Sequence, residues 1–469
     1  MRPSPFVLAV LALLALPSVL VSASGAQTVR SLYSFTGGNS AYPYSGPTQG
    51  RDGKLYGTTE PQNISYFGSI FRLATTGQYT ELYVFDGVDG SQPEAGVTLA
   101  TDGNFYGVAP SGGSASLGVL FKMTPSGQYT VLHAFEGDTD GALPAAAPIE
   151  ARDGNLYGTT AGGGSDVCQY GCGTVYKYEL GPGTLTILYQ FDETHGEYAD
   201  APLIQATDGN LYGTTYQGGA NNCGTIFKLS TSGALLWYYS FPALNGTGGG
   251  CNLFSPLVQA ADGNFYGTTY SGGNVDWGTV FKLDRRSGTV TVLHKFLGTS
   301  SDVRNPVAGL VQGTDGNLYG TGQVGGRGFE GGLFQITTSG VYALLHSFPS
   351  TGGEPNGTML QHTNGRFYGT TSGGGQYEFG SVYGLDMGLG PFITFVLPVG
   401  SAGKTAQILG QGLTGTTSVT FNGVPATSFK VASDTFMTAV VPSGATSGNV
   451  VVTTPSGPLT SNVMFRIIN

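Results

Sequence analysis

The chain has 469 residues, enough for two or three domains, and a formal net charge of −10. Charged residues make up only 10%, whereas glycine occurs 79 times and aromatic residues reach 12%. Disordered chains have few aromatic and many charged residues, so this composition argues against disorder and for short strands joined by tight turns. The acidic balance argues against nucleic-acid binding, because phosphate backbones repel a negatively charged protein.

The first 26 residues have the features of a secretory signal peptide. Arg2 provides a positive charge, residues 6–21 form an apolar run, and small residues follow up to Ala26. The apolar run of about 16 residues is shorter than the roughly 20 that span a bilayer. We therefore predict a signal peptide at 1–26, no membrane span after its removal, and a secreted or cell-surface location.

One motif recurs along most of the chain: Asp-Gly, a variable residue, Leu or Phe, then Tyr-Gly. Its copies begin at Asp52, Asp102, Asp153, Asp208, Asp262, Asp315 and Asn364. Successive copies are 50, 51, 55, 54, 53 and 49 residues apart. A period of this size is typical of solenoids, propellers and other repeat arrays.

Each repeat is interpreted as four strands, a to d. Strand a precedes the Asp-Gly pair, which we expect to form a two-residue type I′ hairpin turn. Strand b carries Leu-Tyr-Gly-Thr-Thr, and a glycine-rich loop leads to strand c, Gly-Thr-Val-Phe-Lys-Leu. Strand d ends in Phe, and a longer loop leads to the next strand a.

The last repeat lacks its strand d, and a spare strand d precedes the first repeat. The seventh strand c ends at Leu385 and a different kind of sequence follows, while residues 29–35 match strand d. A ring closes by pairing such an N-terminal strand with the last blade, whereas an open solenoid gains nothing from a split unit. We therefore predict an all-β fold with a seven-bladed β-propeller at 27–388, closed by the N-terminal strand.

The repeat resembles the GloVer tandem repeat, found in exported bacterial proteins. The motifs that carry the resemblance are Asp-Gly-Asn-Leu-Tyr-Gly-Thr-Thr, the Gly-Gly pairs and Gly-Thr-Val-Phe-Lys-Leu, and they cover all seven units. The resemblance implies a surface protein of the choice-of-anchor group, without an established activity. This chain departs from the anchored pattern in its C-terminal segment.

The segment 389–469 has a different composition, rich in Val, Thr and Ser. Short strands are predicted at 406–409, 418–421, 428–431, 437–441 and 449–453, and Asn422-Gly423 is a hairpin signal. About eighty residues with strands at this spacing predict an immunoglobulin-like β-sandwich. The segment resembles an IPT/TIG domain through residues 408–413, 419–423, Val441-Pro442 and Gly448. The resemblance implies a spacer or adhesion module.

Four cysteines, Cys168, Cys172, Cys223 and Cys251, indicate two disulfides in an exported chain. All four are expected on the face where the b–c and d–a loops emerge. We favour Cys168–Cys172, within one loop, and Cys223–Cys251, between neighbouring loops. A Cys172–Cys223 bridge is the main alternative. Zinc binding is disfavoured, because Cys-x3-Cys without a nearby His is a poor zinc pattern.

Neither a metal nor another cofactor is predicted. Asp86 with Asp89, or Asp138 with Asp140, offers oxygens that suit Ca²⁺, but none of these pairs matches the twelve-residue calcium loop. No nucleophile elbow, zinc-protease motif or phosphate loop is present in the sequence.

The histidines do not form a catalytic constellation. Three of the five, His133, His294 and His346, share one position of strand d, where other repeats carry Tyr. A residue that recurs at an equivalent position is best explained by packing. His195 and His362 have no recognisable Asp–Ser or Cys partner, so we predict no enzymatic activity.

Non-repeating residues of the b–c loops are the candidate ligand-binding groups. They place aromatic rings beside carboxylates, which suits sugars because rings stack on C–H faces and carboxylates bind hydroxyls. The candidates are Tyr66, Phe67, Tyr170, Asp276, Trp277, Phe329, Glu330, Tyr377 and Glu378. Packing of the loops on neighbouring blades is the competing explanation.

We therefore expect a secreted or cell-surface, non-enzymatic binding scaffold whose partner is an extracellular glycan or protein, with no nucleic acid involved. The alternative is an extracellular polysaccharide hydrolase or lyase with its site in the propeller funnel, using Glu330 and Glu378.

Overall fold

The computed structural model describes residues 27–137, 140–243, 249–349 and 352–468. All regular structure in these ranges is β-strand, β1 to β42, so the predicted all-β class is confirmed. No helix that could cross a membrane occurs in this part of the chain. The predicted signal peptide lies outside the described residues.

Seven four-stranded antiparallel sheets occupy the repeat region of the described chain, and their strands follow the predicted order a, b, c, d. The a strands are β2 (Thr48–Gln49), β6 (Thr98–Leu99), β10 (Ile149–Glu150), β14 (Ile204–Gln205), β19 (Val258–Gln259), β25 (Val311–Gln312) and β30 (Leu360–Gln361). The b strands are β3 (Leu55–Thr59), β7 (Phe105–Ala109), β11 (Leu156–Thr160), β15 (Leu211–Thr215), β20 (Phe265–Thr269), β26 (Leu318–Gly322) and β31 (Phe367–Thr371).

The outer half of each sheet consists of strands c and d. The c strands are β4 (Ser69–Leu73), β8 (Val119–Met123), β12 (Thr174–Glu179), β16 (Thr225–Leu229), β22 (Thr279–Leu283), β28 (Gly332–Ile336) and β32 (Ser381–Asp386). The d strands are β5 (Tyr79–Val84), β9 (Tyr129–Ala134), β13 (Thr184–Gln190), β17 (Leu235–Ser240), β23 (Val290–Lys295), β29 (Tyr342–Ser347) and, in the seventh sheet, β1 (Thr28–Ser34). We call these sheets 1 to 7 in the order of their a strands.

Burial explains the Tyr-Gly motif of strand b. The b strands are buried along their whole length, because neighbouring sheets cover both faces. At the motif glycine, the aromatic ring of strand c lies against the backbone: an added Cβ at Gly107 would lie 2.5 Å from Cζ of Phe121. Only glycine leaves room for that ring. The d strands are half-exposed, as expected of an outer edge.

The predicted type I′ turn at Asp-Gly is wrong. Asp52 does not have a positive φ, whereas Gly53 has φ 71°. Gly53 N donates to Gly50 O, and Gly50 N donates to Lys54 O. This is a three-residue loop, a type I turn followed by a left-handed glycine. The Asp52 carboxylate accepts a hydrogen bond from Lys54 N at 3.2 Å, which holds Asp52 in the turn.

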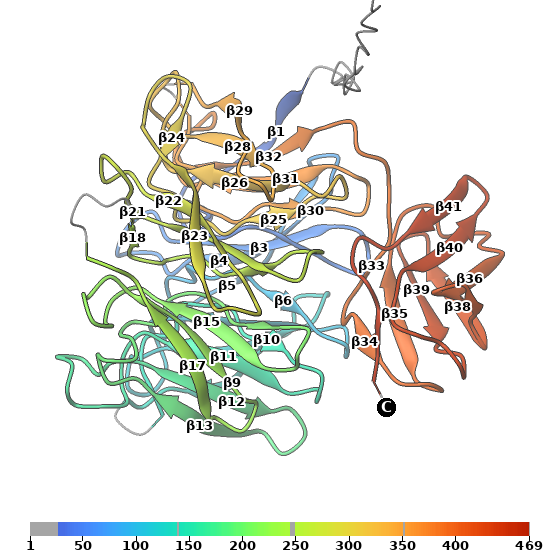
Figure 1. Ribbon diagram of the computed structural model, residues 1–469, viewed down its shortest axis with the longest axis horizontal. Helices are drawn as coiled ribbons and strands as arrows, with labels where there is room; N and C mark the ends of the chain where they lie inside the picture. Colours follow the sequence, from blue (N-terminus) through green and yellow to red (C-terminus); the bar gives the residue numbers. More distant parts are fainter. Residues whose placement is uncertain (1–26, 138–139, 244–248, 350–351, 469) are drawn as a thin grey trace, which may run out of the picture.

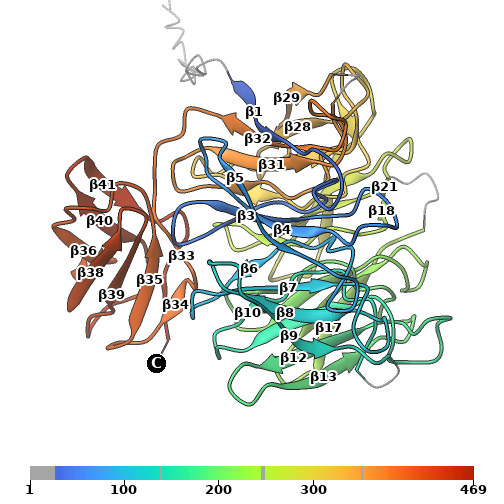
Figure 2. The same ribbon diagram turned by 180° about the vertical axis from the view of Figure 1, so that it is seen from behind.

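The predicted closure by the N-terminal strand is confirmed at the level of strand pairing. Strand β1 pairs antiparallel with β32, from Thr28 opposite Asp386 to Ser34 opposite Ser381. Phe35 N continues the ladder by donating to Gly380 O at 3.0 Å. The two segments lie more than 340 residues apart in the sequence and side by side in Figures 1 and 2.

The hydrophobic clusters join the sheets in a closed order. Each cluster contains side chains of two neighbouring sheets, from sheets 1 and 2 around to sheets 6 and 7. A further cluster joins sheet 7, through Tyr368 and Val382, to sheet 1, through Leu55 and Phe71. Every sheet therefore packs between two others, and none is terminal.

Two more four-stranded sheets follow in the C-terminal region, residues 391–468, around one core that includes Ile408 and Phe421. One contains β33 (Thr394–Phe395), β35 (Thr405–Leu409), β39 (Phe436–Val440) and β38 (Ser428–Ser433). The other contains β37 (Val424–Pro425), β36 (Ser418–Phe421), β40 (Val450–Thr454) and β41 (Gly457–Thr460). Strand β34 (Val399–Gly400) pairs in parallel with β42 (Arg466–Ile467).

Asn422-Gly423 forms the predicted hairpin between β36 and β37. Phe421 pairs with Val424, and both central residues have positive φ, 46° and 85°. This hairpin is therefore a type I′ turn, unlike the Asp-Gly turns of the repeats.

The C-terminal region lies against the Asp-Gly turns of sheets 7, 1 and 2. Arg51 donates to Thr101 O at 2.7 Å and to Gln407 Oε1 at 2.6 Å, and its guanidinium lies 4.6 Å from the ring centre of Phe436. Thr363 of sheet 7 donates to the Gly410 carbonyl at 3.2 Å. In Figure 1 this region lies on the opposite side of the repeats from β18 (Gly250–Cys251) and β21 (Ser271–Gly272).

Candidate functional site

The b–c and d–a loops emerge on the side of the repeats away from the C-terminal region, which we call the loop face. Its backbone repeats in every unit. In each repeat, one backbone hydrogen bond joins the b–c loop to the following d–a loop. The acceptor is the carbonyl of the residue before the strand c glycine, and the donor is the N–H of a d–a loop residue with positive φ. In the first repeat, Phe67 O accepts from Gln92 N at 3.0 Å. The other donors of this set are Tyr42, Leu143, Tyr198, Asn252, Asn305 and Glu354. The loop face is therefore one regular backbone framework with different side chains.

Several predicted site residues serve this framework. Asp276, Phe329 and Glu378 share one left-handed position two residues before the strand c glycine, with φ of 63°, 63° and 64°. Asp276 Oδ1 accepts a hydrogen bond from Gly272 N at 2.7 Å, as Asn222 does from Gly218 N. Asp276 is thus a loop-forming residue.

Two residues at the next position pack against hydrophobic clusters, and a third makes a backbone hydrogen bond. Trp277 lies under the Arg304 guanidinium, 4.2 Å from the ring centre, and borders the cluster between sheets 5 and 6. Phe67 borders the cluster between sheets 1 and 2. The Glu330 carbonyl accepts from Glu354 N at 2.9 Å. Packing, the competing explanation, accounts for these contacts.

The aromatic loop tips remain solvent-exposed. The side chains of Tyr66, Tyr170, Phe329 and Tyr377 are 37, 68, 59 and 48% exposed. Among the described residues, no hydrogen bond or ring stack joins members of the predicted set from different loops. The structure therefore leaves these rings dispersed over the loop face.

A second set of loop-face positions was missed. Two residues after each left-handed d–a residue, the chain enters the next sheet with Tyr44, Glu94, Ala145, Asp200, Phe254, Val307 or Asn356. The residue after each strand b, at the same end of the sheet, is Glu60, Pro110, Ala161, Tyr216, Tyr270, Gln323 or Ser372. The backbone is equivalent in all seven repeats while the side chains differ. We call these fourteen residues the inner ring.

The charges of two inner-ring carboxylates influence each other. Asp200 enters sheet 4 and Glu94 enters sheet 2. Desolvation, the main cause, and then the charge of Glu94 raise the pKa of Asp200 to about 7.

Burial and like charge both act on these carboxyls. Desolvation, then repulsion from Glu94, raises the pKa of Glu60 to about 8. Desolvation also raises the pKa of Glu94, although the residue is exposed. Tyr44, whose pKa desolvation and Glu60 raise to about 12, lies beside them.

Aromatic rings occupy the inner ring on the side of sheets 4 and 5. Tyr216 and Phe254 stack with ring centres 4.3 Å apart, and Tyr270 meets Phe254 edge-on at 5.5 Å. The inner ring thus has a carboxylate side at sheets 1, 2 and 4 and an aromatic side at sheets 4 and 5.

Asn356 holds an unpaired polar atom in the inner ring. It is 8% exposed, its Nδ2 donates to Ser372 Oγ at 2.7 Å, and its Oδ1 has no partner. Exchanging the amide oxygen and nitrogen still leaves one of them unpaired. Asn356 occupies the position equivalent to Tyr44, Glu94 and Asp200.

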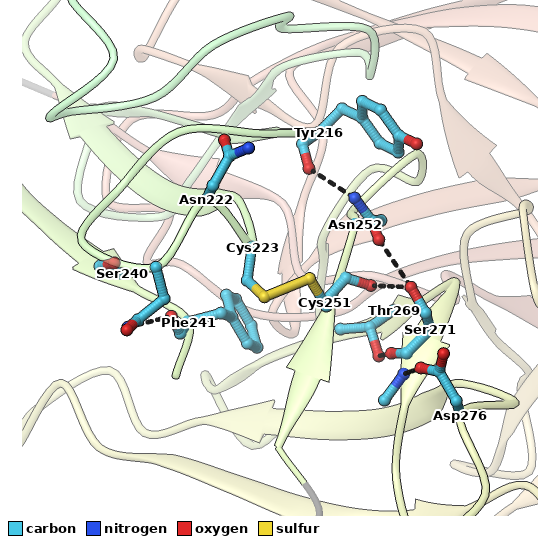
Figure 3. Close-up of a disulfide and its surroundings, with 12 residues drawn as sticks. Tyr216, Asn222, Cys223, Ser240, Phe241, Cys251, Asn252, Thr269, Ser271 and Asp276 are labelled. Atoms are coloured by element: carbon cyan, nitrogen blue, oxygen red, sulfur yellow. Dashed lines mark hydrogen bonds between the residues drawn. A yellow bond between two sulfur atoms is a disulfide. The ribbon is translucent and has the colours of Figure 1, made fainter. Parts of the chain in front are cut away.

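The loop face also carries both disulfides, with the predicted pairing confirmed. Cys168 bonds to Cys172, and Cys223 bonds to Cys251, with Cα atoms 5.1 and 4.4 Å apart. Figure 3 shows the second bridge beside Asn252, whose Nδ2 donates to Tyr216 O at 3.4 Å. Asn252 Oδ1 accepts from Ser271 at 2.6 Å. The bridge fixes the loop that leads into Phe254.

The recurring strand d position is structural, as predicted. In each repeat its Tyr or His meets the Phe two residues later edge-on, with ring centres 5.0 to 5.6 Å apart. His133 Nε2 lies 2.8 Å from Asp140 Oδ2, and Tyr83 hydrogen-bonds Asp89. Asp86 accepts from Val88 N. These carboxylates therefore make hydrogen bonds within their own d–a loops. Asp138, the remaining calcium candidate, lies outside the described residues.

The inner ring has a sequence signal in retrospect. A proline precedes five of its seven d–a positions: Pro43, Pro93, Pro144, Pro306 and Pro355. Aligning the repeats on these prolines as well as on Asp-Gly brings the varied positions into one column.

Comparisons with known proteins agree with the fold. A fungal alcohol oxidase of the AA5 family in complex with copper superimposes with a TM-score of 0.52 at 15% identity, over 94% of this chain and 99% of that chain. An oligogalacturonate lyase from Vibrio parahaemolyticus gives 0.46 at 12% identity, over 76% and 93%. The first likeness concerns the fold alone. No curated protein matches the sequence.

A family model matches residues 19–168, 146–312 and 241–435, which together span the seven repeats. The chain belongs to the Gloeobacter/Verrucomicrobia repeat family.

Proposed function

We propose that residues 27–388 form a seven-bladed β-propeller and that residues 389–469 form an IPT/TIG-like immunoglobulin-fold sandwich. The closed order of clusters and the β1–β32 pairing support the first assignment. Two four-stranded sheets around one core support the second. The disulfides and the repeat family indicate an extracellular protein. We further propose export through the signal peptide at 1–26 and a place in the choice-of-anchor group.

We propose that the protein is a non-enzymatic binding scaffold whose ligand, an extracellular glycan or protein, contacts the centre of the loop face. The observation that carries this proposal is the inner ring, where two backbone positions that are equivalent in all seven repeats hold unlike side chains. Structural demands act equally on all repeats, so they do not explain this variety. Loops on a rigid scaffold are a usual place for binding residues.

The exposed aromatic loop tips, Tyr66, Tyr170, Phe329 and Tyr377, form the outer part of the proposed surface. Rings of this kind bind sugars and protein side chains by stacking and apolar contact.

A glycan-array screen of the secreted protein tests the proposal. We expect a hit that Phe254→Ala weakens at least tenfold, because the stacked ring is lost. Leu236→Ala is the matched control, since Leu236 is 51% exposed on the outer strand β17. Equal binding by wild type and Phe254→Ala would place the ligand elsewhere.

A polysaccharide hydrolase or lyase is the second candidate, favoured by one observation. The pKa values of Glu60 and Asp200, about 8 and about 7, suit proton transfer near neutral pH. The earlier candidates Glu330 and Glu378 lie in separate loops without a hydrogen bond between them among the described residues. Reducing-sugar release that Asp200→Asn abolishes and Glu330→Gln retains would establish this alternative.

A further inference from the structure

We infer that the side of the repeats opposite the loop face holds a second binding site, between sheets 4 and 5, for a sugar residue that carries an anionic group. This site goes beyond the function proposed above, which concerns the centre of the loop face. It rests on a cavity, on an irregular strand pairing in sheet 4 and on the charge of one turn in sheet 5.

A cavity of about 230 Å³ lies between sheets 4 and 5. Tyr212, Lys228 and Trp237 line it from sheet 4, and the turn 284–288 between β22 and β23 lines it from sheet 5. This turn joins strands c and d, so it lies at the same end of the sheet as the Asp-Gly turn. Pockets for whole small molecules usually measure roughly 300–1,000 Å³, so this cavity suits one residue of a longer chain.

The C-terminal region leaves this cavity open. It lies against the turns of sheets 7, 1 and 2 at the same end of the repeats. Among the described residues, it makes no hydrogen bond with any residue that lines the cavity. Residues 285–287 of the turn are exposed.

The strand pairing of sheet 4 directs Trp237 to this cavity. In the other six repeat sheets, the bulge between strands c and d leaves one Leu unpaired, three residues before the strand d Phe. In sheet 4 that position is Tyr238, and the unpaired residue is Leu236. Trp237 therefore lies opposite Lys228, so the indole and the lysine side chain share one face of the sheet. Bulges redirect side chains in this way and are frequent next to active sites.

The indole also explains why the junction between sheets 4 and 5 differs from others. At four other junctions the turn glycine packs on the preceding sheet's backbone, because an added Cβ would lie 2.3 to 3.1 Å from the carbonyl oxygen of the unpaired Leu. These glycines are Gly77, Gly127, Gly233 and Gly340. At Gly288 the nearest atom is instead Cζ2 of Trp237, at 3.3 Å. This turn therefore packs on a side chain where the other turns pack on backbone.

The same turn carries two basic side chains, Arg285 and Arg286. The equivalent positions of the other c–d turns are uncharged, with Thr-Thr, Pro-Ser, Gly-Pro, Thr-Ser and Thr-Ser. Both arginines are exposed and line the cavity, and neither takes part in an ion pair among the described residues. Because the chain has a net charge of −10, two adjacent arginines without a carboxylate partner are not explained by its composition.

The one acidic residue that lines the cavity, Asp284, holds the turn in shape. Its Oδ1 accepts hydrogen bonds from Arg286 N at 3.0 Å and from Ser287 N at 2.8 Å. Gly288 N donates to Asp284 O at 2.9 Å, and Arg285 N donates to Asn264 Oδ1 at 3.2 Å. The backbone that carries the two guanidinium groups is therefore fixed at both ends, while the groups themselves are available to a ligand.

These groups together define the chemistry of the ligand. Guanidinium groups pair with carboxylates and sulfates through charge-assisted hydrogen bonds. The indole of Trp237 offers an apolar ring surface, which packs on the C–H face of a pyranose. An acidic sugar has both an anionic group and such a face. An acidic peptide has the charge and lacks the ring face.

Three tetrasaccharides with one β-1,4-linked glucose backbone test the charge and its source. Cellotetraose is neutral, tetraglucuronate carries carboxylates at C6, and cellotetraose 6-sulfate carries sulfates there. Calorimetric titration should show at least one acidic form binding tenfold or more tighter than cellotetraose, with an affinity that falls as NaCl is added. The tighter of the two acidic forms identifies carboxylate or sulfate as the anion. Equal affinity for all three overturns the inference, and tetraglutamate binding as tightly as the better sugar identifies an acidic peptide instead.

Arg285→Ala tests the location of the site, and Arg327→Ala is its control. Arg327 is an exposed arginine on the loop face, so its removal changes the net charge equally. Affinity for the acidic tetrasaccharide should fall about tenfold in the first variant and stay unchanged in the second. Equal losses in both would reduce the effect to overall charge and overturn the inference.

Fluorescence reports on the indole directly, because Trp237 and Trp277 are the two tryptophans of the chain. Trp277→Phe leaves Trp237 as the single emitter, and its emission should change on saturation with the acidic tetrasaccharide. Trp237→Phe should lose the change. Constant emission in Trp277→Phe overturns the inference, and this variant decides the question even if Trp237→Phe folds poorly.

The outcomes for the two faces are separable. Phe254→Ala, which tests the loop face, should leave binding of the acidic tetrasaccharide unchanged. A loss in Phe254→Ala without a loss in Arg285→Ala would place this ligand on the loop face and overturn the second site. Absence of acidic-sugar binding overturns the second site alone, because the glycan-array test of the loop face does not depend on it.

Discussion

Removing the Cys223–Cys251 bridge should destabilise the protein more than removing Cys168–Cys172. The perturbation is a double Cys→Ala change for each bridge. Alanine is preferred to serine because all four cysteines are at most 5% exposed and border apolar clusters, where a hydroxyl would lack a partner.

The magnitude follows from the lengths of the closed loops. Cys223 and Cys251 are 28 residues apart and Cys168 and Cys172 are 4 apart. The chain-entropy relation then gives about 3.6 kcal/mol for the longer loop and about 2.1 kcal/mol for the shorter one. With an unfolding entropy of roughly 2.1 cal/mol/K per residue over about 360 residues, these losses lower Tm by about 5 °C and about 3 °C.

The assay is urea unfolding and scanning calorimetry of the two double variants beside the wild-type protein, with non-reducing peptide mapping to verify the remaining bridge. An equal or larger loss for the Cys168/Cys172 variant would refute loop closure as the source of stability. A wild-type protein with four free thiols would contradict the bridges themselves.

Three further outcomes are expected. Deleting residues 28–35 exposes the edge of β32, so Tm should fall and light scattering should reveal aggregation; unchanged solubility and Tm would contradict ring closure. The pKa of Asp200 is raised in the folded state to about 7. The contribution of the Asp200 carboxyl to stability is therefore full below its unfolded pKa and is lost as the pH rises toward 7. Urea titration should show that Asp200→Asn raises the free energy of unfolding by about 2 kcal/mol at pH 8 and leaves it unchanged near pH 4. Arg51→Ala removes the contacts to Gln407 and Phe436 and should lower Tm by a few degrees, roughly 1–3 kcal/mol, whereas the exposed Arg285→Ala should not.

Repetition made the strand order, the closure and the disulfides predictable. Each strand appears about seven times, so a single ambiguous copy does not change the assignment. The strand d at 29–35 could be matched to the strand d that is missing after Leu385. The cysteine pairing followed from the same register, because the repeat fixes which loops emerge together. The turn type did not follow, because the Asp52 side chain bonds to the backbone of Lys54 and changes the hairpin from two to three loop residues.

The inner ring escaped sequence-based prediction because its residues are far apart in the chain and become neighbours only through the closed order of sheets. The predicted loop aromatics were noticed because each lies next to another aromatic or acidic residue in the sequence. In the structure, such neighbours in a loop tip are either dispersed over the loop face or packed against the protein, as Trp277 is. Glu94 and Asp200 are 106 residues apart, and each alone looks like an ordinary loop carboxylate.

The same comparison of repeats separates structure from function in this chain. The strand d position holds Tyr in four repeats and His in three, and all seven rings make the same edge-on contact, so the variation is tolerated within one structural role. At the inner ring the backbone is constant and the side chains run from Ala145 to Glu94 to Phe254, with no shared contact. Side chains at equivalent backbone positions that make no contact common to all repeats are free to bind a ligand. This is why we place the ligand at the centre of the loop face.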